Sequence, residues 1–236
     1  MAAFLRYLAG LSPEHQQIWI SKQILGETHL HPDYFRTSIV GDFPERLSVY
    51  QAVLLEMKTA NEMSKAMGRP PIFREEFAES HRPREFGYLL RPTLKEFNDF
   101  VHLLDKMLSE NINRDFFRND VSFAKDEERP DGKIVVKQKG TIQILDDWLE
   151  AEFKTDDRSP IDEMLKTLRS VRALRQKPAH AIKENEFDQK YVREQRELMK
   201  AVYRSVKILR QAIGCHPSAR GVEVDHHLEE GLIWSY

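Results

Sequence analysis

Residues 185–214 read NEFDQKYVREQRELMKAVYRSVKILRQAIG, and this stretch decides the fold class. An apolar residue returns every three or four positions, which is the period of one face of an α-helix. These positions are Phe187, Tyr191, Gln195, Leu198, Val202, Val206, Leu209 and Ile213, and only Gln195 among them is polar. The stretch predicts a long final helix that begins at Asn185, with Asp188 in its first turn, and ends before Gly214.

The helical period continues through most of the chain. Hydroxyl caps, first-turn prolines and helix-ending glycines predict helices over residues 13–25, 45–67, 94–111, 141–153 and 159–176. The stretches 29–44 and 69–91 are expected to be irregular, and Thr93 to Glu96 has the pattern of a capping box. Near residues 120–140, a turn followed by β-prone residues predicts a small hairpin or an extended insertion.

We therefore expect an all-α fold, a helical bundle with extra N-terminal helices and the insertion near 120–140. Ten glycines and eleven prolines are few for 236 residues, which disfavours an all-β sandwich. The expected organisation is an N-terminal helical region at 1–84 packed on the bundle, the bundle domain at 85–214, and a C-terminal tail at 215–236. The apolar end of that tail, around Trp234, is expected to dock on the protein or on a partner.

Composition narrows the function classes. The single cysteine, Cys215, can form neither an internal disulfide nor a cysteine-rich zinc site, so we expect a cytoplasmic protein. No apolar run reaches the roughly 20 residues of a membrane helix, and the first residues lack the basic region of a signal peptide. Neither a phosphate-binding loop, a dinucleotide fingerprint nor a serine-hydrolase elbow occurs.

Charge is distributed unevenly along the chain. The formal net charge is −2, yet residues 158–220 hold 15 Lys and Arg against 7 Asp and Glu. Such a segment can attract a polyanion even in an acidic protein. The alternative is an ordinary solvated helix surface, which is the commoner meaning of a charge run.

Within the basic segment, residues 168–180 read LRSVRALRQKPAH. In one continuous helix Arg175 and His180 would be rotated by roughly 140° and could not reach the same phosphate. Pro178 disfavours helical geometry at Lys177 and has no N–H of its own. We expect one helix to end near Gln176 and a new turn to begin at Pro178, so that Arg175 and His180 face a common opening.

That arrangement suits phosphodiester cleavage. Histidine titrates near neutrality, so His180 can take a proton from a 2′-hydroxyl or give one to a leaving oxygen. Arg175 stays charged and presents a fork of donors to a phosphate. The residues expected to bind RNA along the same ridge are Lys166, Arg169, Arg172, Gln176 and Lys177.

At these residues the chain resembles the HEPN superfamily, whose signature is R-x4–6-H with a polar residue after the arginine. Glutamine at 176 and proline at 178 depart from the commonest form of that signature. The resemblance implies a bundle that forms a homodimer, in which two motifs meet to make a metal-independent endoribonuclease without a cofactor. It also implies toxin–antitoxin, phage-defence or RNA-processing systems, with RNA or an antitoxin-like protein as partner.

A second function class remains open, namely a non-catalytic HEPN-like module that binds RNA or a protein partner. In that interpretation Arg175 caps a helix and His180 is an ordinary interhelix histidine. The alternating His29, His31 and Asp33 permit a metal site, but loop histidines are more often plain turn residues. His226 and His227 suggest the same chemistry and are interpreted as part of a solvated tail, so we expect no metal. Cys215 beside His216 has no visible base that would activate it.

Overall fold

The computed structural model describes residues 5–21, 23, 25–27, 29, 32–41, 45–78, 81–128, 132, 134–176 and 185–234. The chain divides into two compact units, residues 1–45 and residues 46–236. The pair Arg175 and His180 is therefore described only in part, because residues 177–184 lie outside these ranges.

The first unit consists of short helical segments. They are α1 (Leu5–Ala9), α2 (Pro13–Ile20), α3 (Pro32–Tyr34) and a π-helical turn at Phe35–Val40. Helix α2 begins as predicted, with Pro13 in its first turn and the Ser12 hydroxyl accepting the His15 N–H at 3.5 Å. It ends at Ile20 rather than at residue 25, and helical turns occupy part of the 29–44 stretch that was expected to be irregular.

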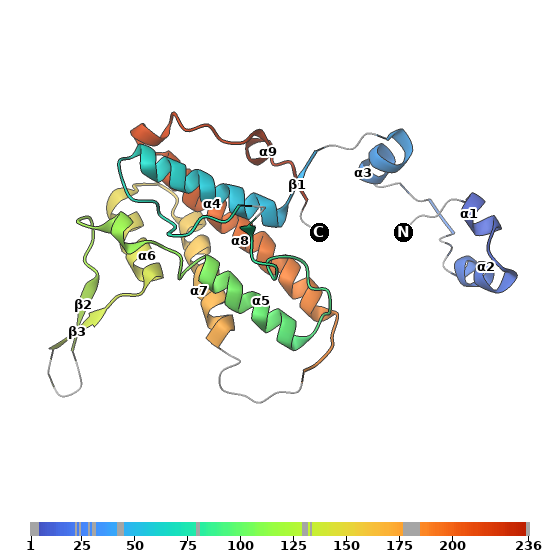
Figure 1. The fold of residues 1–236 in the computed structure, drawn as a ribbon, viewed down its shortest axis with the longest axis horizontal. Coiled ribbons are helices and arrows are strands. Elements are labelled where there is room, and N and C mark those ends of the chain that lie inside the picture. Colours follow the sequence, from blue (N-terminus) through green and yellow to red (C-terminus); the bar gives the residue numbers. More distant parts are fainter. Residues whose placement is uncertain are drawn as a thin grey trace. The chain divides into compact units, whose positions relative to one another are not determined.

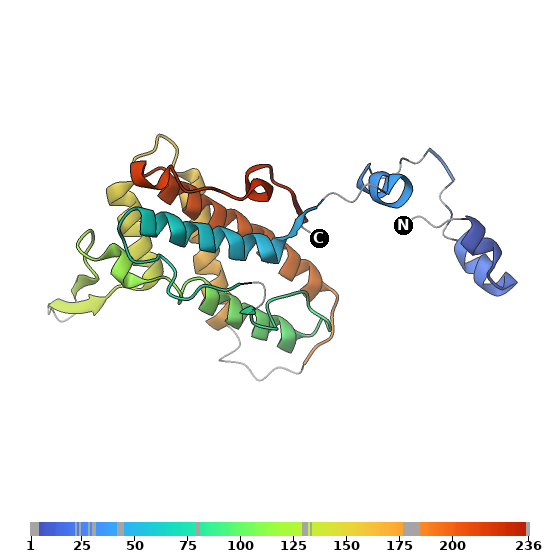
Figure 2. The ribbon, with the colours of Figure 1, turned by 45° about the horizontal axis from the view of Figure 1, so that its top comes forward.

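The second unit carries the predicted bundle and hairpin (Figures 1 and 2). Its elements are β1 (Leu47–Ser48), α4 (Val49–Ala66), α5 (Leu94–Met107), a 3-10 turn (Arg114–Phe117), β2 (Ala124–Glu128), β3 (Ile134–Gln138), α6 (Thr141–Glu152), α7 (Ser159–Gln176), α8 (Lys190–Gly214), a 3-10 turn (Pro217–Ala219), α9 (His226–Glu229) and β4 (Ile233–Trp234). Strands β2 and β3 pair antiparallel, so the all-α class with a small hairpin insertion is confirmed.

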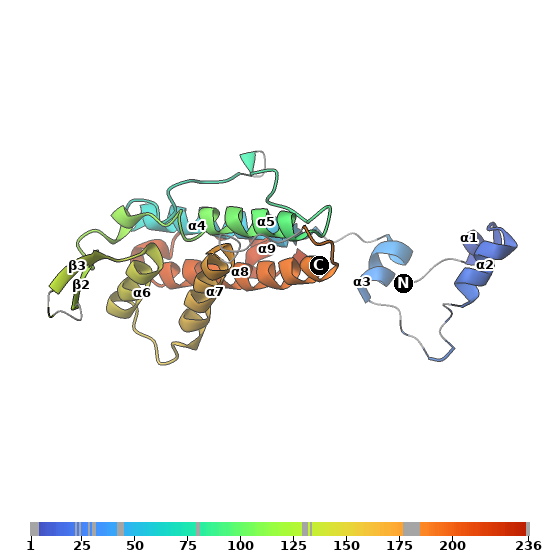
Figure 3. The ribbon, with the colours of Figure 1, turned by 90° about the horizontal axis from the view of Figure 1, so that it is seen from below.

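Helix α8 is the central element of the second unit. It packs against α4 on one side and α7 on another, while α5 packs against α7 (Figures 1 and 3). The predicted apolar stripe faces the core from Tyr191 onward, with Tyr191, Val202 and Ile213 almost completely buried. Phe187, predicted as its first member, lies before α8 and is exposed. Gln195, the polar member of the stripe, is also buried, because its amide hydrogen-bonds the Leu89 N–H at 3.1 Å and the Gly87 carbonyl at 2.9 Å. The irregular 69–91 segment is thereby fastened to α8.

Helix α4 shows why the units divide at residue 45 instead of at the predicted boundary between residues 84 and 85. Its start at Ser48 is a complete capping box with Gln51, and Gly68 adopts the left-handed conformation (φ 72°) just past its end. Between these ends α4 buries a broad apolar face and packs along α8. The helix is therefore an integral layer of the bundle.

The segment before α8 differs from the prediction. Helix α8 begins at Lys190, and residues 185–188 lie alongside residues 92–95 instead. The Leu94 N–H donates to the Glu186 carbonyl at 2.8 Å, and the Asn185 side chain accepts the Lys95 N–H at 3.0 Å. Asn185 thus satisfies a free N–H at the start of α5, not of α8.

The capping box predicted at the start of α5 is half formed. The Thr93 hydroxyl accepts the Glu96 N–H at 3.2 Å, as expected. The Glu96 carboxylate, however, accepts from the Arg91 backbone N–H at 3.0 Å and from its Nε at 2.7 Å. These two bonds hold the pKa of Glu96 below its usual value.

The tail docks on the second unit through strand β4, which pairs in parallel with β1. The Arg46 guanidinium lies 4.8 Å from the centre of the Trp234 ring, and Leu228 is fully buried. Within the described ranges, no helix combines the length and apolar character required to cross a membrane.

A buried ion pair joins α4 to α8. Glu56 is fully buried, and its carboxylate accepts from Arg210 Nε at 2.7 Å and from Nη2 at 3.3 Å. A two-bonded guanidinium satisfies both carboxylate oxygens, which is the condition for keeping such a charge away from water.

Glu56→Ala is expected to lower the free energy of unfolding by about 3–5 kcal/mol, because it leaves the Arg210 charge buried without a partner. Equilibrium urea unfolding followed by circular dichroism measures this change. Glu62→Ala is the matched control on the same helix, since the exposed Lys58–Glu62 pair is worth at most about 1 kcal/mol. Equal losses in the two variants would contradict the prediction.

Candidate functional site

Arg175 occupies the last turn of α7, and two carboxylates hold its side chain. Its Nη1 donates to Asp105 Oδ2 at 2.7 Å and also to the Glu110 carboxylate. Asp105 is completely buried, whereas the Arg175 side chain is 26% exposed. The hydrogen bonds that Arg175 donates to Glu110 and Asp105 raise the pKa of Arg175 above its usual value, so the guanidinium stays charged.

The two preceding arginines of the predicted basic ridge are also bound to acids. Arg172 Nε lies 3.4 Å from Asp105 Oδ1, and Arg169 Nη2 lies 2.7 Å from Asp146 Oδ2. Asp146, on α6, also accepts from Arg158 at 2.6 Å. The ridge therefore carries much less net positive charge than its sequence indicates, because α5 and α6 supply compensating carboxylates.

The remaining residues of the predicted site divide into two groups. Lys166 and Gln176 are exposed on α7, and neither side chain hydrogen-bonds another residue in the described part of the chain. Lys177, Pro178 and His180 lie outside the described residues. Helix α7 extends to Gln176, the position at which the sequence predicted its end. The structure thus brings Arg172 and Arg175 together on Asp105.

The carboxylates that organise these arginines were not identified from the sequence. A signal for Asp105 was present, because it follows Leu104 and lies four residues after Val101, on the apolar face of α5. An acidic residue on the apolar face of a helix is expected to be buried, and a buried carboxylate needs a positively charged or hydrogen-bonding partner. Glu110 and Asp146 lie at positions with no such signal, and only the packing of helices shows their partners.

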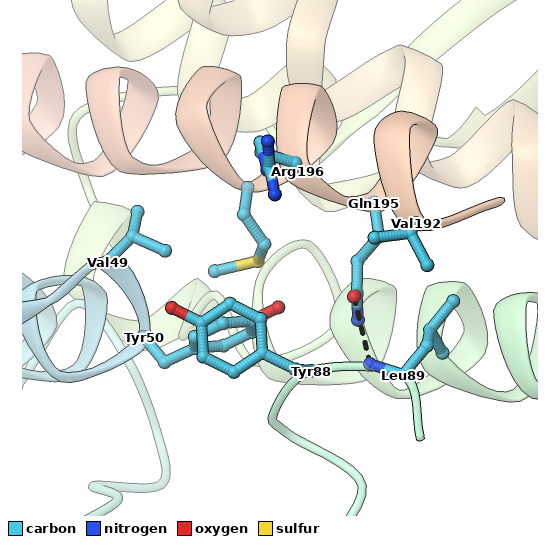
Figure 4. A pocket seen from close by; sticks show the side chains of 8 residues that line it. Val49, Tyr50, Tyr88, Leu89, Val192, Gln195 and Arg196 are labelled. Carbon is cyan, nitrogen blue, oxygen red and sulfur yellow. Dashed lines mark hydrogen bonds between the residues drawn. The ribbon is translucent and has the colours of Figure 1, made fainter. Parts of the chain in front are cut away.

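A small pocket lies where the start of α4, residues 88–89 and α8 meet (Figure 4). It is lined by Val49, Tyr50, Tyr88, Leu89, Val192, Gln195, Arg196 and Met199. Its volume of about 30 Å³ is sufficient for about one water molecule. The pocket is too small to hold a nucleotide, and Arg175 does not line it.

The histidine clusters in the sequence have structural explanations. Asp225 caps α9: its Oδ1 accepts the His227 N–H at 2.9 Å and lies 2.8 Å from His227 Nδ1. These bonds hold the pKa of Asp225 below its usual value. The possible ligand atoms of Asp225, His226 and His227 lie within 4.8 Å of one another, but the cap accounts for their closeness.

The other candidate ligands and the thiol are described only in part. His29 lies 3.8 Å from the exposed Glu27, while His31 and the Asp33 side chain are outside the description. Cys215 is exposed at the end of α8, and the neighbouring His216 accepts the Ser218 N–H at 3.2 Å through Nδ1. That bond occupies the ring nitrogen that a base would use.

Asp105→Ala is expected to lower the free energy of unfolding by about 3 kcal/mol, because two hydrogen bonds between charged groups are lost, each worth roughly 1.5–3 kcal/mol. Equilibrium denaturation measures the change. Asp99→Ala is the control, since Asp99 is an exposed acid on the same helix. A loss for Asp105→Ala no larger than that of the control would show that Asp105 does not anchor α7.

Comparison of this chain with protein-family models, curated proteins and solved structures finds no match.

Proposed function

We propose that this protein is a metal-independent endoribonuclease of the HEPN type, which cleaves RNA through the 2′-hydroxyl. In this proposal His180 is the general acid–base and Arg175 stabilises the phosphate. Toxin–antitoxin and phage-defence systems are the settings in which we would place such an activity. The proposal rests on the R-x4-H spacing and on the way in which Arg175 is held.

The supporting observation is the geometry of the Arg175 guanidinium. Both of its hydrogen bonds are made by Nη1, to Asp105 and Glu110. Its Nη2 and Nε donate to no atom in the described ranges of the chain, and the side chain is partly exposed. A guanidinium fixed by one nitrogen is pre-oriented, and its opposite edge remains available for two bonds to a phosphate.

The proposed reaction is an internal transesterification. His180 removes the proton from the 2′-hydroxyl, and the oxygen attacks the adjacent phosphorus. The bond from phosphorus to the 5′-oxygen breaks, and a proton is returned to that leaving oxygen. The products are a 2′,3′-cyclic phosphate and a 5′-hydroxyl, so no water enters this step. Arg175 would stabilise the charge that grows on the phosphate oxygens.

A homodimer completes the proposal, because one histidine cannot remove and deliver a proton at the same moment. Two motifs that meet at a twofold axis would supply two histidines, one as base and one as acid. The bundle of the second unit is the part of the chain that we expect to form this interface.

A second candidate function is a non-catalytic helical module that binds RNA or a protein. The observation that favours it is the pairing of Arg169, Arg172 and Arg175 with carboxylates. An arginine whose charge is already compensated attracts a phosphate less strongly than a free one. Activity measurements separate the two candidates.

Purified protein is expected to cleave single-stranded RNA in excess EDTA and to leave 2′,3′-cyclic phosphate ends. His180→Ala should remove this cleavage, since a general acid–base group contributes about 10²–10⁴-fold. Arg175→Lys keeps the charge but loses the fork, so cleavage should fall at least about tenfold. Gel analysis of labelled RNA gives the rates.

His102→Ala is the matched control, because His102 is an exposed histidine on α5 that is not part of the motif. Thermal unfolding of every variant ensures that the assays use folded protein, since Arg175 also anchors α7. RNA left intact by the wild-type protein over a broad substrate set would exclude the nuclease and favour the non-catalytic module.

Sedimentation velocity is expected to show a dimer at micromolar concentration. Sedimentation as a monomer at all concentrations up to about 100 μM corresponds to a free energy of association weaker than roughly −5.5 kcal/mol. That result would contradict the proposed pairing of two motifs in a dimer. Cleavage by a strictly monomeric protein would require a different acid.

A further inference from the structure

The solvent face of α8 carries a row of basic side chains that the sequence motif does not include. Helix α8 advances 100° and 1.5 Å per residue, so positions three and four apart lie on one face. Five basic residues follow this spacing within an arc of about 80° and a length of about 21 Å. We call them the α8 stripe: Arg193, Arg196, Lys200, Arg204 and Lys207.

The α8 stripe lies opposite the buried face of its helix. Tyr191, Met199 and Val206 on the other side are core residues, whereas Arg193, Arg196 and Arg204 are exposed. Helices α4 and α7 pack against other sides of α8 (Figures 1 and 3). The three arginines of the stripe are exposed, as are Glu194 and Glu197 of the same helix, while Lys200 and Lys207 are half-buried.

Few carboxylates compensate the α8 stripe. Lys200 Nζ lies 2.9 Å from Glu197, and Arg204 lies 3.9 Å from the exposed Glu163 of α7. Lys207 Nζ lies 6.0 Å from the centre of the Tyr203 ring. Within the described ranges, no ion pair joins Arg193 or Arg196 to an acid. The stripe thus keeps a net positive charge.

The ridge on α7 is the opposite case. There the buried or partly buried carboxylates Asp105, Glu110 and Asp146 bind the arginines at or below 3.4 Å. Among the described residues between 158 and 220, the uncompensated positive charge therefore lies mainly on α8. A polyanion approaching this unit meets a more positive surface at the α8 stripe than along α7.

An exposed aromatic ring lies at one end of the stripe. Tyr88 is 55% exposed and, like Arg196, lines the pocket shown in Figure 4. Its ring packs edge-on against Tyr50, with the ring centres 4.9 Å apart, which fixes its orientation. A basic row beside a fixed aromatic ring is the combination that single-stranded nucleic acids use, with phosphates on the charges and a base stacked on the ring.

We propose that the α8 stripe, with Tyr88 at its end, is a binding surface for single-stranded RNA. Successive charges about 4.5–6 Å apart along the axis present a regular row to a regularly charged backbone. This inference rests on the proposed function for the choice of RNA as the polyanion. It assigns the binding of the strand to α8 and leaves the Arg175 motif to act on one phosphate.

The test measures binding separately from cleavage. A fluorescent 2′-O-methyl oligouridylate of about 12 nucleotides has no free 2′-hydroxyl, so it cannot be cut and suits the usual site size. Its anisotropy is titrated with full-length protein at several salt concentrations. Contacts to five phosphates predict a slope of log K against log salt near −3.5, since each contributes about 0.7.

The triple variant Arg193→Gln, Arg196→Gln and Arg204→Gln removes three exposed charges of the stripe. Its slope is expected near −1.4, and its affinity at about 0.1 M salt should be about 100-fold weaker. Tyr88→Leu keeps the apolar contact but removes the stacking face, so it should weaken binding at least about fivefold while leaving the slope unchanged.

The control triple variant, Arg118→Gln, Lys125→Gln and Lys137→Gln, makes the same change in net charge at and before the hairpin, where all three residues are exposed. It should bind within about threefold of the wild type, because screening confines charge effects to about 10 Å. If both triple variants lose affinity equally, only net charge matters and the proposal is overturned.

Three further outcomes would overturn the proposal. The first is unchanged binding of the oligonucleotide in the α8 triple variant, and the second is absence of binding by the wild type. The third is displacement of the oligonucleotide by polyglutamate or by anionic lipid vesicles as effectively as by unlabelled RNA. Loss of cleavage in His180→Ala with binding retained supports the stripe. Binding by a wild-type protein that cuts no RNA leaves the stripe standing and removes only the nuclease.

Discussion

The second unit depends on the rule that a carboxylate enters a protein interior only with partners. Asp105 has no exposed surface, and the arginines that satisfy it come from the last two turns of α7. This pairing fixes the C-terminal end of α7 against α5 and sets the direction in which Arg175 leaves its helix. Glu56 and Arg210 apply the same rule between α4 and α8. The charge pairs thus set helix alignments that apolar side chains alone specify weakly.

Much of the fold could be predicted from the sequence, because helices and hairpins leave local signals. The period of α8, the cap at Ser12 and the pairing of β2 with β3 all depend on residues near one another in the chain. The errors occur where distant segments compete for the same group. Asn185 has the pattern of a helix cap, yet its side chain serves the start of α5, some 90 positions away in the chain. A boundary near residue 84 ignored α4, whose partner α8 lies far along the sequence.

The candidate site was predictable only in part, for a similar reason. The spacing of Arg175 and His180 is a local property, and so is the high count of basic residues between 158 and 220. Which of these basic side chains lack an acidic partner does not depend on neighbouring residues in the sequence. Carboxylates on α5 and α6 pair with the arginines of α7, and they do not pair with Arg193 or Arg196 of α8. The periodicity of α8 already contained the row of basic residues opposite its apolar stripe. Recognising it required knowing which sides of the helix pack against α4 and α7.

The parallel pairing of β1 with β4 brings the first and last strands of the second unit into contact, with Leu47 opposite Ile233. The first and last strands of this unit therefore lie side by side. Neighbouring termini are the condition for circular permutation. A short linker could join the ends, and the chain could be reopened in the exposed connection between α6 and α7. A chain permuted in this way would keep every contact of α4, α7 and α8 while changing only the order in which these helices follow one another.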